Sequence, residues 1–234
     1  MRTIGLLGGM SWESSIDYER LINEGVRTRL GGVHSADLVV RSYDFARIEA
    51  LQSAGRWDDA GELLAGDAVR LQQAGAEIVV LCTNTMHVVA PAIEAALDVE
   101  FLHIGDATAR AVRAAGVTTA GLLGTRYTME QDFLRARLES HGLTVLVPDE
   151  PDRSVVHDVI YDELVRGVRS DSSRRAYLEV IGRLVERGVG GIIAGCTEIE
   201  LLVGPDDVDV AYFATTALHA AAAVDASLGA DSPL

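Results

Sequence analysis

Two cysteines, Cys82 and Cys196, are the only thiols in the chain, and each stands where a short apolar run gives way to polar residues. The run 78–81 precedes the first cysteine, the run 191–194 precedes the second, and both cysteines are followed by threonine. Ligands of open α/β sheets bind beyond the carboxyl ends of strands. Loop N–H groups and a helix start there would bind a carboxylate and favour a thiolate. Two thiols on opposite walls of one cleft suit two-base proton transfer, in which one removes a proton from carbon and the other returns one.

A free cysteine is more often a small buried hydrophobic residue than a base. A duplication favours the chemical interpretation here. The segment 4–8 recurs as 120–124, and the segment 75–83, which contains Cys82, recurs as 188–197, which contains Cys196. The first pair of segments is offset by 116 residues and the second by 113 to 114, so the sequence predicts two similar lobes of roughly 100–115 residues each.

The elements that must position these cysteines alternate along the chain. Apolar runs predict strands at 3–8, 38–42, 78–81, 101–104, 120–123, 144–147, 191–194 and 209–212. Amphipathic stretches predict helices at 13–30, 57–74, 87–96, 106–115, 128–141, 154–167, 172–187 and 215–228. Thr128 and Gln131 have the spacing of a capping box. This alternation predicts an α/β protein with two Rossmann-like lobes, each a mostly parallel sheet flanked by helices, and a cleft between them. We expect residues 1–104 plus 215–234 to form the lobe carrying Cys82, and residues 105–214 the lobe carrying Cys196.

Composition excludes several classes of protein. The net charge of −15 repels nucleic acid and anionic membranes, so we do not expect either as a partner. No apolar run is long enough to span a membrane and the N-terminus lacks a signal-peptide pattern, so we expect a cytoplasmic protein. All 20 basic residues are arginines, which leaves no lysine to hold pyridoxal phosphate as an imine. Metal-ligand spacings, a Walker A loop and a GxGxxG loop are also absent, so we expect no cofactor and no metal.

Several segments, taken in order, resemble the aspartate/glutamate racemase family over essentially the whole chain. They are Gly5–Met10, Met10–Glu13, Cys82–His87, Leu123–Gln131 and Gly195–Glu198. The resemblance implies the fold of that family and racemisation of amino acids without pyridoxal phosphate, with Cys82 and Cys196 as the two bases. The more specific segments are similar to a bacterial branch with broader amino-acid specificity. A small-molecule amino acid as substrate and a homodimer are also implied.

The same resemblance assigns further residues to substrate binding. Thr83, Asn84, Thr85 and Thr197 match residues that hold the α-carboxylate and the amino group. Glu198 would pair with the substrate ammonium, although a glutamate at a helix start is an equally good explanation. Met10 and Gln52 match positions on substrate loops, and for Gln52 an exposed loop glutamine is the more common alternative.

Three departures from the aspartate-specific members leave strict aspartate specificity in doubt. Phe45 stands where those members have an arginine, and Val165 stands where they have a lysine. Those two cations would hold a side-chain carboxylate, which phenylalanine and valine do not. Ala214 also replaces an aspartate near the C-terminus.

Other interpretations stay open at this point. The same fold carries hydantoin racemases, maleate isomerases and arylmalonate decarboxylases, and a two-lobed binding protein without catalysis is a further alternative. Several isolated residues are expected to have ordinary roles. His87 is expected to be a polar residue near the mouth of the cleft, Trp12 and Trp57 to be packing residues, and Arg126 to lie on the surface.

Overall fold

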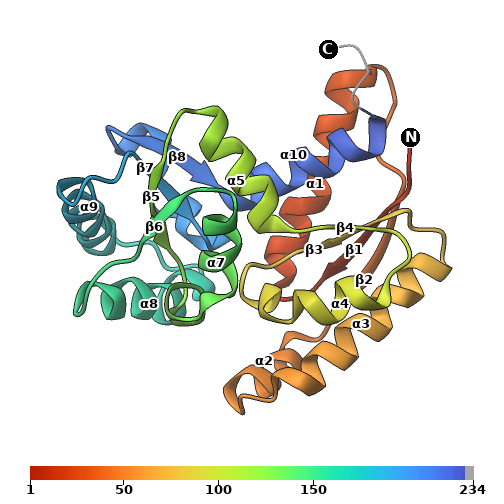
Figure 1. Cartoon of the computed structure of the whole chain (residues 1–234), viewed down its shortest axis with the longest axis horizontal. Helices are drawn as coiled ribbons and strands as arrows, with labels where there is room; N and C mark the ends of the chain where they lie inside the picture. Colours follow the sequence, from red (N-terminus) through yellow and green to blue (C-terminus); the bar gives the residue numbers. More distant parts are fainter. Residues whose placement is uncertain (230–234) are drawn as a thin grey trace. The chain divides into compact units, whose positions relative to one another are not determined.

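A computed structural model describes residues 1–229 of the chain, which divide into two compact units (Figure 1). Unit 1 contains residues 1–104 and the described residues from His219 onward, and unit 2 contains residues 105–218. The division near the C-terminus follows Leu218, inside a helix, whereas the sequence places it at the start of that helix. Residues 230–234 of the expected first lobe lie outside the described residues.

Each unit is built on a four-stranded sheet whose strands are all parallel. The sheet of unit 1 has the order β2-β1-β3-β4, with β1 Ile4–Gly8, β2 Leu38–Ser42, β3 Ile78–Leu81 and β4 Glu100–Leu102. The sheet of unit 2 has the order β6-β5-β7-β8, with β5 Thr119–Leu123, β6 Thr144–Leu146, β7 Gly191–Ala194 and β8 Ala211–Ala214. The predicted fold class is confirmed, and β3 and β7 occupy the same place in their sheets.

Helices follow the strands in both units. The α-helices are α1 Trp12–Leu30, α2 Phe45–Ser53, α3 Trp57–Gln73, α4 Ala90–Ala96, α5 Ile104–Ala114, α6 Arg126–Glu130, α7 Asp132–Ser140, α8 Asp152–Asp162, α9 Asp171–Glu186 and α10 Thr215–Leu228. Short 3-10 helices are η1 Thr85–Val89, η2 Leu164–Arg166, η3 Thr197–Leu201 and η4 Pro205–Asp207.

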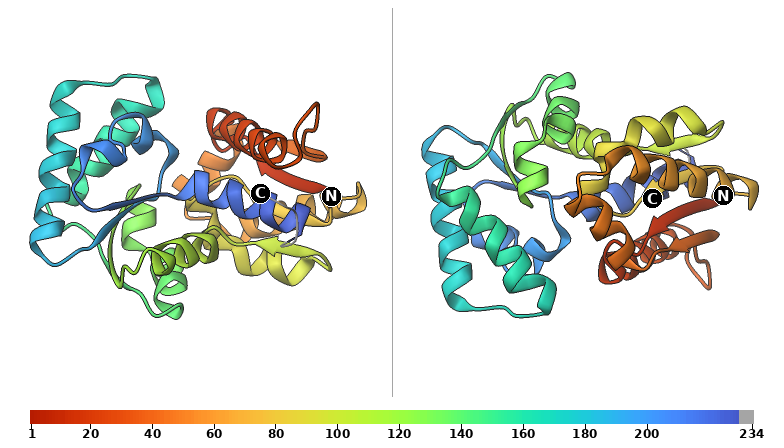
Figure 2. Two further views of the ribbon diagram at one scale, coloured as in Figure 1. Left: turned by 90° about the horizontal axis from the view of Figure 1, so that it is seen from above. Right: turned by 90° about the horizontal axis from the view of Figure 1, so that it is seen from below.

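Apolar side chains cover both faces of the sheet in unit 1. Ile22 of α1 and Val224 of α10 pack with Ile4 and Ile78 on one face. Leu64 of α3 and other side chains of α3 and α4 form a second cluster on the opposite face. In unit 2, α8 and α9 pack against β5 and β7, while α5 and α7 lie on the other side of these strands from α9 (Figures 1 and 2). Burial on both faces explains why the strands read as continuous apolar runs.

The structure differs from the predicted elements at several places. The predicted helix 128–141 is two helices that meet at Gln131, and Thr125, rather than Thr128, is the N-cap that accepts a hydrogen bond from the backbone of Thr128. The helix α2 was not predicted, and its N-cap is Asp44, whose side chain accepts from Ala46 N at 3.2 Å. β8 lies two residues later than the predicted strand, because the polar residues before Ala211 form η4 and a loop.

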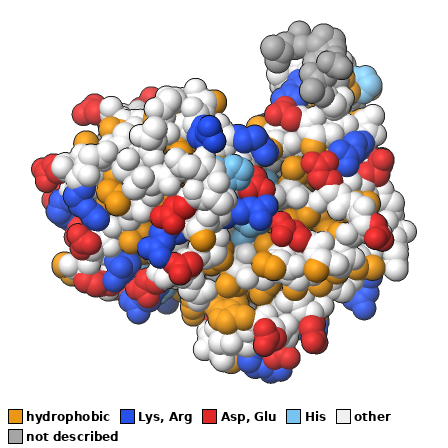
Figure 3. All heavy atoms as spheres, in the orientation of Figure 1, with side chains coloured by type: hydrophobic (Ala, Val, Ile, Leu, Met, Phe, Trp, Pro, Cys, Tyr) orange, Lys and Arg blue, Asp and Glu red, His pale blue; other side chains and the backbone are white. Residues whose placement is uncertain are grey.

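Two observations concern the charges on the surface and the hydropathy of the helices. On the face shown in Figure 3, acidic and basic side chains are interspersed, and no continuous basic stripe crosses that face. None of the helices in residues 1–229 is both long enough and apolar enough to cross a membrane.

Candidate active site

Cys82 lies directly after β3, at the carboxyl edge of the sheet in unit 1. Its backbone N–H donates to the carbonyl of Leu7 on β1 at 2.9 Å, which extends the ladder by one residue. The thiol is fully buried, with the carbonyl of Val80 at 3.8 Å from Sγ. Burial raises the pKa of Cys82 well above its usual range, because the thiolate loses its hydration there. Cys82 is therefore a protonated thiol in this state.

The three polar residues after Cys82 form a tight loop into η1. Thr83 is half-buried, and Asn84 and Thr85 are buried. The predicted α-helix 87–96 begins only at Ala90, because Pro91 fits the first turn of a helix but its ring would clash with the carbonyl of His87 in a continuous one. A five-residue 3-10 helix thus follows the cysteine instead of the long helix expected there. The dipole of this short helix contributes little to stabilising a thiolate at Cys82.

Met10 and Gln52 lie within unit 1 but are not exposed loop residues. Gln52 belongs to α2 and is buried, which corrects the interpretation of an exposed loop glutamine. Its Nε2 donates to Sδ of Met86 at 2.9 Å. Met10 follows β1 and shares an apolar cluster with Met86, whereas the side chain of Cys82 belongs to the cluster on the other face of the sheet.

Cys196 lies beyond the end of β7, one residue further from its strand than Cys82 lies from β3. Gly195 precedes it, and a Cβ on that glycine would lie 2.9 Å from the carbonyl of Leu123, so only glycine allows this close approach of the two strands. The half-buried thiol of Cys196 donates to Oε2 of Glu198 at 2.8 Å, and the hydroxyl of Thr197 donates to the same oxygen at 3.0 Å. The three predicted residues Cys196, Thr197 and Glu198 thus form one hydrogen-bonded cluster in unit 2.

The electrostatics of this cluster keep Cys196 protonated. Burial raises its pKa well above the usual value, and the negative charge of Glu198 and the hydrogen bond to it raise the pKa further. The pairing of Glu198 with a substrate ammonium stays a prediction, and in the structure its carboxylate accepts a hydrogen bond from the thiol. A carboxylate at 2.8 Å from a thiol is within reach of the proton that must leave before Cys196 acts as a base.

An ion-pair cluster around the buried carboxylate of Asp67 lies beside the carboxyl edge of β2 and was not predicted from the sequence. Asp67 of α3 accepts from the hydroxyl of Tyr43 at 2.7 Å and from Nε of Arg41 at 2.9 Å, and it also pairs with Arg70. The guanidinium of Arg41 lies 4.3 Å from the ring centre of Tyr43. Asp67 lies among the buried positions of α3, and a charged residue at a buried helix position is the sequence signal that could have predicted this cluster.

Two ordinary roles expected from the sequence are wrong. His87 is buried in η1, so it is not a polar residue at a cleft mouth. Trp12 is 60% exposed at the start of α1 and is not a packing residue, whereas Trp57 packs against the apolar cluster of unit 1. Arg126 is half-exposed at the start of α6, as expected for a surface arginine.

The three departures from aspartate-specific relatives lie at separate places. Phe45 begins α2 and packs against the apolar cluster of unit 1. Val165 lies in η2 of unit 2 and is exposed, and Ala214 ends β8. Arg41, a candidate replacement for a missing cation, already binds Asp67 and the carbonyl of Ser42.

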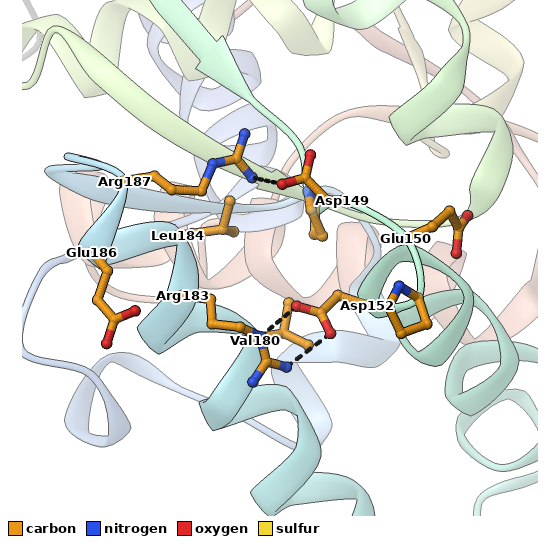
Figure 4. Close-up of a pocket in the computed structure, with 10 residues that line it drawn as sticks. Asp149, Glu150, Asp152, Val180, Arg183, Leu184, Glu186 and Arg187 are labelled. Carbon is orange, nitrogen blue, oxygen red and sulfur yellow. Dashed lines mark hydrogen bonds and ion pairs between the residues drawn. The ribbon is translucent and has the colours of Figure 1, made fainter.

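A cavity of about 570 Å³ in unit 2 lies apart from these clusters, between the loop after β6 and the C-terminal half of α9 (Figure 4). None of the predicted site residues lines it. Arg183 forms a bidentate pair with Asp152 at 2.5 and 2.8 Å, and Arg187 pairs with Asp149 at 3.3 Å. The two arginines of this cavity are therefore bound by its own carboxylates. Within residues 1–229, no group of three or more histidine, cysteine, aspartate or glutamate side chains is arranged to hold a metal ion.

Two parallel sheets of the same strand order, each with a cysteine one or two residues beyond its third strand in sequence, define a duplicated α/β protein of the Asp/Glu racemase fold. A sequence model of the Asp/Glu/Hydantoin racemase family matches residues 7–223. The chain belongs to that family.

Solved structures agree with this assignment. A provisionally named Asp/Glu racemase from Yersinia pestis is 53% identical, with 98% of this chain and 100% of that chain covered and a TM-score of 0.94. An aspartate racemase homologue from Pyrococcus horikoshii is 30% identical over 98% of this chain and 100% of its own, with a TM-score of 0.87. The aspartate racemase of Picrophilus torridus, at 19% identity, 97% and 94% coverage and a TM-score of 0.71, shares the fold. Family and homologues support an isomerase.

Proposed function

We propose that this protein is a cofactor-independent amino-acid racemase in which Cys82 and Cys196 are the two bases. The observation that carries the proposal is the repetition of one chemical group at one topological position: a thiol beyond β3 in one sheet and beyond β7 in the other. A single catalytic thiol would explain only one of these positions. Inversion at the α-carbon requires a base and an acid on opposite faces, and two thiols can fill these two roles.

Each direction of the reaction needs one thiolate and one thiol. Burial raises both pKa values, which favours the protonated form of each thiol. In our proposal Glu198 takes the proton of Cys196 when that thiol serves as base. Thr83, Asn84, Thr85 and Thr197 hold the α-carboxylate, so that negative charge developing there in the transition state is stabilised. A homodimer in the cytoplasm, acting on a free amino acid, is part of the same proposal.

We propose a substrate range broader than aspartate. The support is that Phe45 and Val165 carry no charge and that Arg41 already has a buried carboxylate partner. The test is a panel of L- and D-amino acids incubated with the enzyme and analysed by chiral chromatography. We expect turnover of several amino acids, including some without a side-chain carboxylate. Turnover confined to aspartate would show that another cation, such as Arg126, holds that carboxylate.

A further inference from the structure

Two hydrogen bonds of the His87 imidazole fix the position of its proton. The backbone N–H of Ile104 points at Nε2 over 3.2 Å, and a backbone N–H can only donate. Nε2 must therefore carry the lone pair. Nδ1 lies 2.7 Å from the carbonyl oxygen of Thr83, which can only accept. The ring is consequently neutral, with its proton on Nδ1.

These two hydrogen bonds join two functionally different parts of unit 1. Thr83 is the residue directly after Cys82, and its own N–H donates to the carbonyl of Leu81 at 2.9 Å. Ile104 is the last residue of unit 1 before the chain enters unit 2, and it begins α5. The side chain of His87 thus connects the loop after Cys82 to the start of α5, where the chain leaves unit 1.

The second point at which the chain passes between the units also lies beside the ring of His87. The chain re-enters unit 1 at His219, whose ring lies between the hydroxyl of Tyr18 and the carbonyl of Leu102, both at 2.9 Å. The ring centre of His87 lies 5.8 Å from that of His219 and 4.6 Å from that of His103. All three histidines are buried, so the rings form a packed support under the Cys82 loop.

We infer that His87 is a positioning residue for Cys82, acting through the carbonyl of Thr83. The inference rests on the proposed function, because it assigns the residue that orients one of the two bases. Its Nδ1–H fixes the peptide plane between Thr83 and Asn84, while Nε2 fixes the start of α5. A shift of the order of 1 Å in a reacting group is enough to slow catalysis by about a hundredfold.

Two substitutions separate the two hydrogen bonds. The side-chain amide of asparagine can place a donor near Nδ1, so His87→Asn retains the bond to Thr83. Glutamine can place an oxygen near Nε2, so His87→Gln retains the bond to Ile104 and loses the bond to Thr83. His34→Gln is the control, because His34 is an exposed histidine in the same unit.

The experiment measures exchange of the α-hydrogen with deuterated solvent at saturating amino acid, so that weaker substrate binding does not enter. Each His87 variant is combined with Cys196→Ala, where only Cys82 can act, and separately with Cys82→Ala, where only Cys196 can act. We expect His87→Gln to slow the exchange that depends on Cys82 by roughly ten- to a hundredfold and the exchange that depends on Cys196 by less than about twofold. His87→Asn should slow the Cys82-dependent exchange less than His87→Gln does, and His34→Gln should change neither.

Equal losses in both backgrounds, or no loss in either, would overturn the role of His87. If neither cysteine variant exchanges hydrogen while His87 is intact, the proposed function itself fails, and the assignment of His87 falls with it. A second measurement does not depend on folding of the variants: ¹⁵N NMR of the histidine rings in the unaltered protein should show His87 protonated at Nδ1 alone. Protonation at Nε2 would overturn the inference.

Discussion

At the residue scale, the two cysteines occupy equivalent positions but different environments. Cys82 is fully buried beside a backbone carbonyl, whereas Cys196 is half-buried and bonded to a carboxylate. Burial raises both pKa values, and among residues 1–229 the hydrogen-bond partner of Cys196 is a carboxylate, whereas that of Cys82 is a carbonyl. The two thiols are therefore expected to differ in reactivity even if they perform symmetrical steps.

The substitution Glu198→Gln tests the electrostatic part of this difference. Removing the negative charge stabilises the thiolate, so the pKa of Cys196 should fall toward its ordinary value of about 8.5. Alkylation of Cys196 by iodoacetamide, followed by peptide mass spectrometry across pH, should accelerate at a lower pH than in the unaltered protein. Racemisation should nevertheless slow by about tenfold or more, because the proton acceptor is gone.

Asp206→Asn is the matched control for this experiment, since it removes one exposed negative charge from the same unit. It should leave the pH profile of Cys196 alkylation unchanged. An unchanged profile in Glu198→Gln as well would show that Glu198 does not set the pKa of Cys196.

At the scale of elements, the turn after β1 depends on a glycine. Gly9 has a φ of +83°, and a Cβ there would lie 2.2 Å from the backbone nitrogen of Tyr43, a distance that no relaxed structure allows. The N–H of Gly9 also donates to the hydroxyl of Ser15 at 2.6 Å. This turn carries Met10 and holds the ends of β1 and β2 together.

Gly9→Ala should therefore lower the free energy of unfolding by more than about 2 kcal/mol, the sum of left-handed strain and displaced backbone. Gly167→Ala separates the two effects, because Gly167 has a φ of +74° and a ψ of 10°, in the left-handed helical region, and no atom within 4 Å of an added Cβ. Its cost should be about 1 kcal/mol. Urea denaturation of both variants measures the difference, and equal costs would exclude the close approach as a cause.

Sequence periodicity predicted most elements because the strands are short apolar runs and the long helices are amphipathic. It missed α2, whose nine residues give too short a pattern. It merged α6 with α7 because a single residue, Gln131, separates them and makes no side-chain cap hydrogen bond to α7. The two cysteines and their polar neighbours were predictable, since strand ends and a duplication mark them. The bonds of Glu198 to Cys196 and of His87 to Thr83 were not, because they depend on side-chain directions within loops and 3-10 helices.

At the scale of the whole molecule, the account predicts an enzyme that needs nothing but its own chain. No lysine is present to bind pyridoxal phosphate, and protons are the only species that the proposed reaction transfers. Dialysis against a strong chelator should leave racemisation unchanged, and added divalent metal should not increase it. Loss of activity on chelation, restored by a divalent metal, would contradict this prediction.

The most direct test of the two-base account is to remove each thiol separately and follow both racemisation and α-hydrogen exchange in deuterated water. The account predicts that Cys82→Ala and Cys196→Ala each abolish racemisation while remaining folded by circular dichroism. Each should still exchange the α-hydrogen of one enantiomer, and the two variants should act on opposite enantiomers. Near-normal racemisation by either folded variant would contradict the account, because a chain with one thiol would then complete an inversion that requires two.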